Sequence, residues 1–290
     1  MNNTCPRCGK EYSKDNIPRK RTTRYEDCIL KCRNCKIGIS NNNKTIIYKN
    51  YLDNIPKQLY NRLEFILKNN LNIKSHSQKI IRMGFSTSED SLSWIFFSYF
   101  LIYNRQYILL DLFNIDSKKI VNIYFWGSGY FDNLLFVKEL KKILKDIFFE
   151  NEKSFSEPDI IIETENKIIF IEIKYHSKNV SKCDKNKVKK YVKSKYYKDE
   201  DKAIKSEYYE LIRNWSILNE IGKNKECYLY NIGLRKNFEK ETKTDKYNLF
   251  LESLIKSENF IRYYWEDIVE KINNKDVDEW FYKVMYKWVS

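Results

Sequence analysis

Two acidic residues and a lysine near the middle of the chain have the types and spacing that metal-assisted hydrolysis requires. One β-rich run follows Asp159 and a second precedes Glu172, with a short polar segment between them. This pattern predicts a β-hairpin, and a two-residue turn at Glu165-Asn166 would place Asp159 directly opposite Glu172. Because side chains alternate along a strand, we expect Lys174 on the same face, two residues beyond Glu172.

The two carboxylates need a cation between them. Cross-strand partners have Cβ atoms about 4.5 to 5.5 Å apart, so two ionised side chains there would repel each other. Magnesium, or manganese in its place, would meet this need: such a hard cation takes one or two carboxylates and fills its other positions with water and phosphate. We therefore predict that Asp159 and Glu172 hold the metal and that Lys174 orients or polarises the attacking water.

The hairpin resembles that of the PD-(D/E)XK nuclease superfamily, with Pro158-Asp159 as the PD element and Glu172-Ile173-Lys174 as the ExK element. The resemblance covers most of the chain as an order of elements, and it implies a restriction-endonuclease-like fold. It also implies hydrolysis of DNA phosphodiester bonds and a role in restriction or defence against foreign DNA. The non-catalytic alternative is a charged hairpin face on which Glu172 and Lys174 form a surface pair.

The resemblance further implies an acidic residue from the first core helix. We expect a helix to open at Ser86, with an apolar stripe formed by Leu92, Ile95, Phe96, Tyr99 and Ile102. Glu89 matches the catalytic acid of the superfamily, but Ser86-x-x-Glu89 is also a capping box, and both interpretations remain open. Asp90 is the second candidate for this acidic residue. Glu139, on a helix expected over residues 134–148, is a further candidate.

Two CxxC pairs near the N-terminus predict a structural zinc site. Four thiolates from two tight turns complete a tetrahedral zinc site, and the spacing favours Cys5, Cys8, Cys32 and Cys35. The segment resembles a zinc ribbon. Cys28 could replace Cys32 or remain a free thiol, while Cys183 and Cys227 have no partner spacing. A site of four thiolates is closed, so this zinc would stabilise a segment too small for its own core.

Positive charge is concentrated in two segments. The chain has a formal net charge of +14, and residues 1–50 and 174–205 each hold 12 basic and 4 acidic side chains. Such patches attract polyanions, so we predict nucleic acid as the partner, DNA first and RNA second; a solvated lysine-rich surface is the alternative. His176 is expected in a loop beside the site. The predicted phosphate-binding residues are Lys178, Lys185, Lys187, Lys189, Lys190 and Arg213.

The predicted architecture is α/β: a restriction-endonuclease-like core, with a central mixed sheet flanked by helices, and a small N-terminal zinc-ribbon domain. We expect the zinc ribbon over residues 1–40, a connector with a short strand and a helix over 41–84, and the nuclease-like domain over 85–290. A helix over 206–220 and a strand over 227–234 follow the hairpin. The aromatic C-terminal stretch has roughly helical spacing, which favours packing, and the stacking of bases is the alternative.

The function predicted from these patterns is a metal-dependent endonuclease acting on DNA. Two alternatives are a nucleic-acid-binding module that does not cut, and an adaptor whose zinc ribbon docks onto a larger DNA-processing complex. Cleavage of both strands by one such site favours a homodimer, and a larger defence complex is the other candidate assembly. The longest apolar run is too short for a membrane span, and the N-terminus has no apolar signal segment, which favours the cytoplasm.

Overall fold

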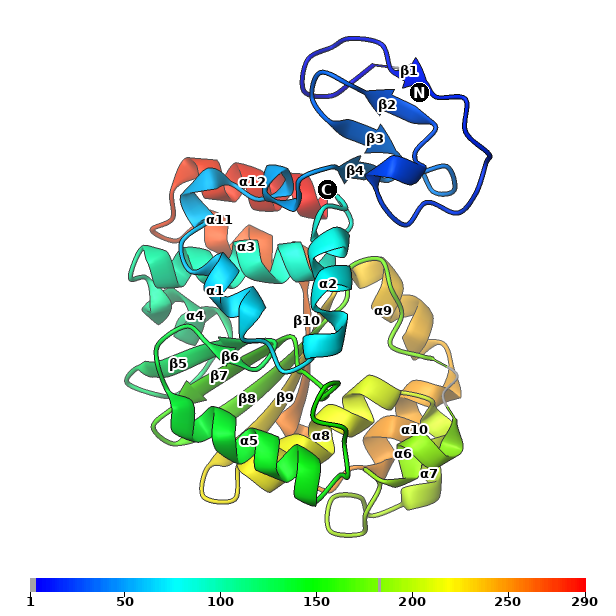
Figure 1. Cartoon of the computed structure of the whole chain (residues 1–290). Helices are drawn as coiled ribbons and strands as arrows, with labels where there is room; N and C mark the ends of the chain where they lie inside the picture. Colours follow the sequence, from blue (N-terminus) through cyan, green and yellow to red (C-terminus); the bar gives the residue numbers. More distant parts are fainter. Residues whose placement is uncertain (1–3, 182–183) are drawn as a thin grey trace.

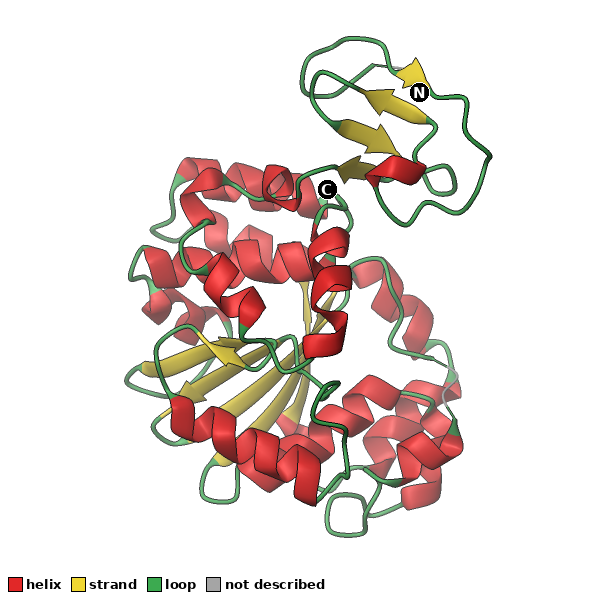
Figure 2. Ribbon diagram, viewed as in Figure 1, coloured by secondary structure: helices red, strands yellow, loops and turns green. Residues whose placement is uncertain are grey.

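The computed structural model describes residues 4–181 and 184–290, so Cys183 lies outside the described residues. A small antiparallel sheet at the N-terminus sits above a larger α/β core (Figure 1). In the core, helices cover both faces of one twisted sheet (Figure 2). The predicted α/β class is confirmed at this level, with a mixed six-stranded sheet and a separate N-terminal cluster of cysteines.

The N-terminal module, defined here as residues 4–48, is an antiparallel sheet in the order β1-β2-β3-β4. Its core is very small: Cys5, Cys32 and Ile37 form one buried cluster, and Cys28 and Ile47 are the other buried hydrophobic residues. The short strand expected in the connector is present and completes this sheet by pairing with β3. The strands are β1 (Ser13–Lys14), β2 (Leu30–Cys32), β3 (Ile37–Ile39) and β4 (Ile46–Tyr48).

The core sheet has the order β10-β9-β8-β7-β5-β6. Strands β8, β9 and β10 run parallel, whereas β7, β5 and β6 are joined by antiparallel pairing. The bounds are β5 (Ile120–Phe125), β6 (Ser128–Gly129), β7 (Ile160–Thr164), β8 (Lys167–Ile173), β9 (Glu226–Gly233) and β10 (Phe260–Tyr264).

The predicted hairpin is confirmed together with its register. Strands β7 and β8 pair antiparallel, with Ile160 opposite Ile171 and Glu163 opposite Ile168. Continued by one position, this register sets Asp159 opposite Glu172. The two-residue turn at Glu165-Asn166 was sufficient to predict it, because turn length fixes which residues of a hairpin pair. The strands themselves are buried on both faces and give no alternation of apolar and polar residues.

Two hydrophobic clusters cover the two faces of the sheet. Alternate residues of β8 belong to different clusters: Ile169 and Ile171 face α3, while Ile168 and Phe170 face α5 and α8. The first face carries α1 (Leu63–Lys68), α3 (Glu89–Ile102), α4 (Gln106–Leu112), α11 (Trp265–Asn273) and α12 (Glu279–Val289). The second carries α5 (Leu134–Asp146), α6 (Lys185–Lys189), α7 (Glu200–Ser206), α8 (Tyr209–Ile221) and α10 (Asp245–Ser253). Helices α2 (His76–Met83) and α9 (Arg235–Thr242) lie near one end of the sheet (Figure 1).

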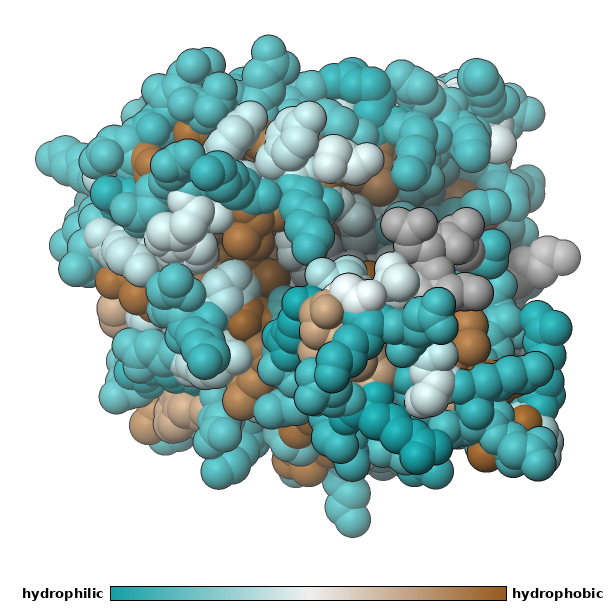
Figure 3. All heavy atoms as spheres, turned by 90° about the horizontal axis from the view of Figure 1, so that it is seen from above, coloured by the Kyte–Doolittle hydropathy of each residue, from teal (hydrophilic) through white to brown (hydrophobic). Residues whose placement is uncertain are grey.

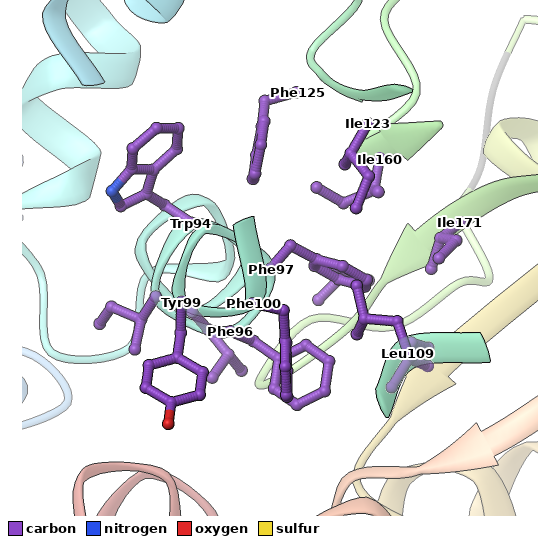
Figure 4. Packing of buried hydrophobic residues seen from close by; sticks show 14 of the residues in the cluster. Trp94, Phe96, Phe97, Tyr99, Phe100, Leu109, Ile123, Phe125, Ile160 and Ile171 are labelled. Atoms are coloured by element: carbon purple, nitrogen blue, oxygen red, sulfur yellow. The ribbon is translucent and has the colours of Figure 1, made fainter. Parts of the chain in front are cut away.

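Helix α3 differs from its predicted amphipathic form. Every residue from Ser91 to Leu101 is buried, so no single apolar stripe exists. Figure 4 shows aromatic side chains leaving this helix in several directions, toward Phe125, Ile160 and Leu109. Other elements enclose the helix, because the sheet lies on one side and α11 and α12 lie on others.

Two further predictions need correction. The aromatic C-terminal stretch is not helical throughout, since Phe260–Tyr264 form β10 beside β9 before α11 begins. The helix expected in the connector is divided into a short 3-10 turn at Lys57–Leu59 and α1, because Arg62 between them has a φ of +62°. A left-handed residue cannot continue an α-helix.

Among the described residues, no helix is both long enough and apolar enough to span a membrane. Figure 3 looks onto the molecule from above and shows a surface dominated by hydrophilic residues. This view agrees with the 32% of charged residues in the sequence.

Candidate active site

A cleft of about 860 Å³ lies where β7 begins and β8 ends. Asp159, Glu172 and Lys174 all line it, as the hairpin register predicts. Residues of α2, the first turn of α3, the segment 154–157 and α8 form the other walls. The cleft therefore lies at the ends of the strands that carry the predicted chemistry, where loops rather than strands border the opening.

Lys174 joins two carboxylates inside this cleft. Its Nζ donates to Oε1 of Glu172 over 2.7 Å and to Oε2 of Glu210 over 2.6 Å. Glu172 and Lys174 are almost fully buried, with exposed fractions of 3% and 5%. Asn214 on α8 donates to the other oxygen of Glu172 over 2.8 Å. Glu172 and Lys174, which point to the side of the sheet covered by α8, are thus held by residues of α8.

Asp159 is fixed by the backbone of the neighbouring strand. Its Oδ2 accepts a hydrogen bond of 2.8 Å from the amide of Ile173. Burial raises the pKa of Asp159 well above its ordinary value, and the nearby charge of Glu172 raises it further. One oxygen is therefore occupied by the backbone, and the cleft holds a carboxyl that is costly to ionise without a cation nearby.

The charges of the site depend on one another. Burial raises the pKa of Glu172, although Lys174 opposes this effect. Burial alone would lower the pKa of Lys174, but Glu172 and Glu210 raise it above its ordinary value. Lys174 and Arg213 outweigh the effect of burial on Glu210 and lower its pKa. Lys174 consequently stays protonated, and its charge is the main compensation for the acids around it.

Glu89 lines the same cleft but is engaged elsewhere. Its Oε1 accepts hydrogen bonds from the amide of Tyr175 over 2.7 Å and from the hydroxyl of Ser177 over 2.7 Å. It does not form the predicted capping box, because the N-cap of α3 is Ser88, whose side chain accepts from the amide of Ser91. Glu89 therefore anchors the segment that follows β8. Its helix covers the opposite face of the sheet from Glu172.

The other two acids considered for this role, Asp90 and Glu139, lie in different environments. Asp90 pairs with Lys79 of α2 over 3.0 Å, and Lys79 also pairs with Glu157 over 2.7 Å. All three line the cleft. Glu139 is exposed on α5 and does not line it, so the third candidate acid is not supported.

The predicted phosphate-binding residues divide into two groups. Arg213 lines the cleft, where Glu210 and Glu172 raise its pKa against the effect of burial. The lysines do not line it, and Lys185 and Lys189 border a separate hollow between α6, α7 and α8. His176 is exposed at the edge of the cleft. The lysines outside the cleft are Lys178, Lys185, Lys187, Lys189 and Lys190.

Sequence reasoning missed several residues of the site. Glu210 pairs with Lys174 and Asn214 with Glu172, and neither residue was predicted as part of the site. Their spacing of four residues on α8 was a usable signal, because it places both on one helix face. The Lys79–Glu157 pair had no such signal, since its partners are 78 positions apart and meet only through packing.

The donor set of the cleft fits a hard divalent cation. Asp159 and Glu172 supply two carboxylates on adjacent strands, and magnesium accepts so few protein ligands when water and phosphate complete its shell. Within the described residues, no acidic trio brings its oxygens within 4.8 Å of one another. Glu89 therefore does not join Asp159 and Glu172 as a third direct ligand in this arrangement.

The four predicted cysteines converge in the N-terminal module. The sulfur atoms of Cys5, Cys8, Cys32 and Cys35 all lie within 4.8 Å of one another. Those of Cys8 and Cys32 are 3.7 Å apart, close to the edge of about 3.8 Å in a tetrahedron with Zn–S bonds of about 2.3 Å. The amide of Cys35 also donates to the sulfur of Cys32. This cluster fits a structural zinc ion.

Cys28 is not part of this cluster. It is buried between the 3-10 turn Tyr25–Asp27 and β3, and burial raises the pKa of its thiol to about 12. A Cβ on Gly38 would lie 2.6 Å from its sulfur, so glycine at that position makes room for the thiol. The alternative in which Cys28 replaces Cys32 is therefore not supported, because Cys28 acts as a small apolar side chain.

Asp27 should stabilise the module in a pH-dependent way. Burial would raise its pKa, but Lys20 and Thr23 donate hydrogen bonds that lower it well below the ordinary value. We expect Asp27→Asn to reduce the free energy of unfolding of the module by about 1.5 to 3 kcal/mol near pH 7.

The sign of this pH dependence follows from the lowered pKa. The contribution of Asp27 is fully present above the unfolded pKa of about 4, and it is lost as the pH falls through the folded value. Thermal unfolding of both forms between pH 7 and pH 3 would measure this effect. A gap between wild type and Asp27→Asn that widens toward pH 3 would contradict it.

Comparisons with family models, with curated proteins and with solved structures found no match to this chain.

Proposed function

We propose that this protein is a metal-dependent endonuclease that hydrolyses DNA phosphodiester bonds, with a restriction-endonuclease-like core and a zinc-ribbon module. The observation that carries the proposal is the placement of Asp159, Glu172 and Lys174 in one cleft, on adjacent strands and in the register that the superfamily motif requires. A charged outer hairpin face is a poor alternative, because Glu172 and Lys174 are buried inside the cleft rather than exposed.

Asp159 and Glu172 would hold the metal ion, magnesium or manganese. When bound, such an ion lowers the pKa of a water molecule and stabilises negative charge on the phosphate. The chain itself supplies the orientation of these two acids. The amide of Ile173 holds Asp159, and Asn214 holds Glu172, so neither carboxylate is free to rotate away from the cleft.

Lys174 would direct the attacking water. An ammonium group has three N–H donors, and two of them are used by Glu172 and Glu210. The third is available for the water or a phosphate oxygen in the cleft. In the hydrolysis, the water oxygen bonds to phosphorus, one ester P–O bond breaks, and the leaving oxygen takes up a proton. Arg213 would face the charge that develops on the phosphate.

The decisive experiment is a cleavage assay on supercoiled, linear and single-stranded DNA and on RNA, with magnesium, manganese or EDTA. We expect metal-dependent cutting of DNA by the wild type and its loss in Lys174→Ala. Circular dichroism must show that the variant is folded, because the change leaves Glu172 and Glu210 without their cation. No cutting of any polymer with any metal would reject the enzyme and favour a module that only binds.

Glu210 is proposed as a positioning residue that acts through Lys174. Glu210→Gln should lower the single-turnover rate at saturating DNA by about 10- to 100-fold, with little change in DNA affinity, because it removes one of the two anchors of the ammonium group. Glu210→Asp should recover part of the loss by restoring a charge.

A suitable control for Glu210 is Glu207→Gln. Glu207 precedes α8, pairs with Lys246 and does not line the cleft. Equal rate losses in the two variants would show that Glu210 serves only the stability of this region.

A further inference from the structure

We infer that the DNA backbone is held between the core and the N-terminal module, with Arg21 of the module and Arg82 of α2 binding phosphates beyond the one that is cut. This inference rests on the proposed nuclease function and adds a binding role for the module beside its structural zinc. It follows from the positions and partners of the basic residues that line the cleft.

The cleft must attract a polyanion although its walls are rich in carboxylates. Five basic residues line it within the described ranges: Arg21, Lys79, Arg82, Lys174 and Arg213. Lys79 and Lys174 are buried and form ion pairs with acids of the cleft, and Arg213 is half-buried beside Asn214. Arg21 and Arg82 are the two that are exposed, and neither forms an ion pair within the described residues.

Arg21 is unusual among the arginines and lysines around the cysteine cluster. Five other basic residues of the module face carboxylates, namely Arg7 with Asp53, Lys20 and Arg24 with Asp27, and Lys31 and Arg33 with Asp15. Arg19 donates to a backbone carbonyl. Of these residues, Arg21 alone both lines the cleft and, within the described structure, keeps its guanidinium free for a phosphate.

The backbone that carries Arg21 is anchored on both sides. Asn41 donates to the carbonyl of Lys20 over 3.0 Å, and its amide donates to the hydroxyl of Thr22 over 2.8 Å. The amide of Thr22 donates to Asn42 over 3.1 Å. The loop is therefore held at a defined position in the module, which reduces the entropy lost when its arginine binds.

The module is also joined to the core next to Arg82. The amide of Tyr48 in β4 donates to the carbonyl of Gly84 over 2.8 Å, and Ser86 donates to the carbonyl of Ile46 over 2.9 Å. Gly84 follows α2 directly, and Arg82 occupies the last turn of that helix. Arg82 thus lies at the junction with the module, so the two free arginines line the module side of the cleft and Arg213 lies on the α8 side.

The test is the binding of a fluorescein-labelled DNA duplex, measured by fluorescence anisotropy without added divalent metal over 50 to 200 mM KCl. We expect Arg21→Ala and Arg82→Ala each to weaken binding about 3- to 10-fold at 100 mM KCl. Each should also make the slope of the logarithm of the association constant against the logarithm of the KCl concentration less negative by about 0.9, the value for one lost phosphate contact.

The matched control is Lys14→Ala. Lys14 is exposed on β1 of the same module and carries the same charge, but it does not line the cleft. We expect less than a 2-fold change and an unaltered slope. If Arg21→Ala and Arg82→Ala behave like Lys14→Ala while the wild type still cuts DNA, the inference that DNA is held between the core and the module is wrong. The proposed nuclease function would be unaffected by that result. A wild type that neither binds nor cuts DNA would overturn both.

Discussion

Replacing Glu172 by glutamine is expected to lower the rate of metal-dependent DNA cleavage by about 10³-fold or more while the protein remains folded. The change removes one of two carboxylates available to the metal and one of the two acids that hold Lys174. Lys174 keeps its ion pair with Glu210, so the loss of charge balance is smaller than in Lys174→Ala. Single-turnover cleavage over a range of magnesium concentrations measures the effect.

The control for this prediction is Glu163→Gln on the same hairpin. Glu163 is also buried on β7, where it accepts from Tyr124 and pairs with Lys225, but it does not line the cleft. This variant should lose stability and retain cleavage at temperatures where it is folded. Equal losses of activity in the two variants, with both folded, would contradict the assignment of Glu172 as a metal ligand.

Loss of zinc is expected to unfold the N-terminal module. The buried apolar residues of the module are only Cys5, Cys28, Cys32, Ile37 and Ile47, too little apolar surface to support a fold alone. Structural zinc contributes about 10 to 16 kcal/mol of binding free energy in zinc-finger peptides at pH 7. Cys32→Ser should therefore abolish stoichiometric zinc and expose the module to limited proteolysis, while the core remains protected by its own two hydrophobic clusters.

Cys28→Ser is the matched control for zinc loss. Cys28 is buried in the same module, but its sulfur lies outside the cluster. The variant should keep one zinc per chain, measured by elemental analysis, and lose only a modest part of its stability. If Cys32→Ser retained zinc, or if Cys28→Ser lost it, the ligand set would be wrong.

Patterns within short stretches of the sequence predicted much of the fold. The hairpin, α5, α8 and β9 were placed to within a few residues, because each has a clear hydrophobic period and a defined turn or boundary. The environment of α3 was not predicted, since a helix enclosed on several sides has no polar face to mark its orientation. The strand Phe260–Tyr264 was also missed, because a short aromatic run satisfies both helical and strand periods.

The sequence by itself determined the part of the candidate site that depends on local geometry. A two-residue turn sets the register that unites Asp159 and Glu172, and paired CxxC turns bring four sulfurs together. Only the tertiary structure decided that Glu89 anchors the segment after β8 and that Glu210 holds Lys174. The register of a hairpin follows from the length of its turn, a local property of the chain. Contacts between helices and strands far apart in sequence depend instead on how the hydrophobic faces pack.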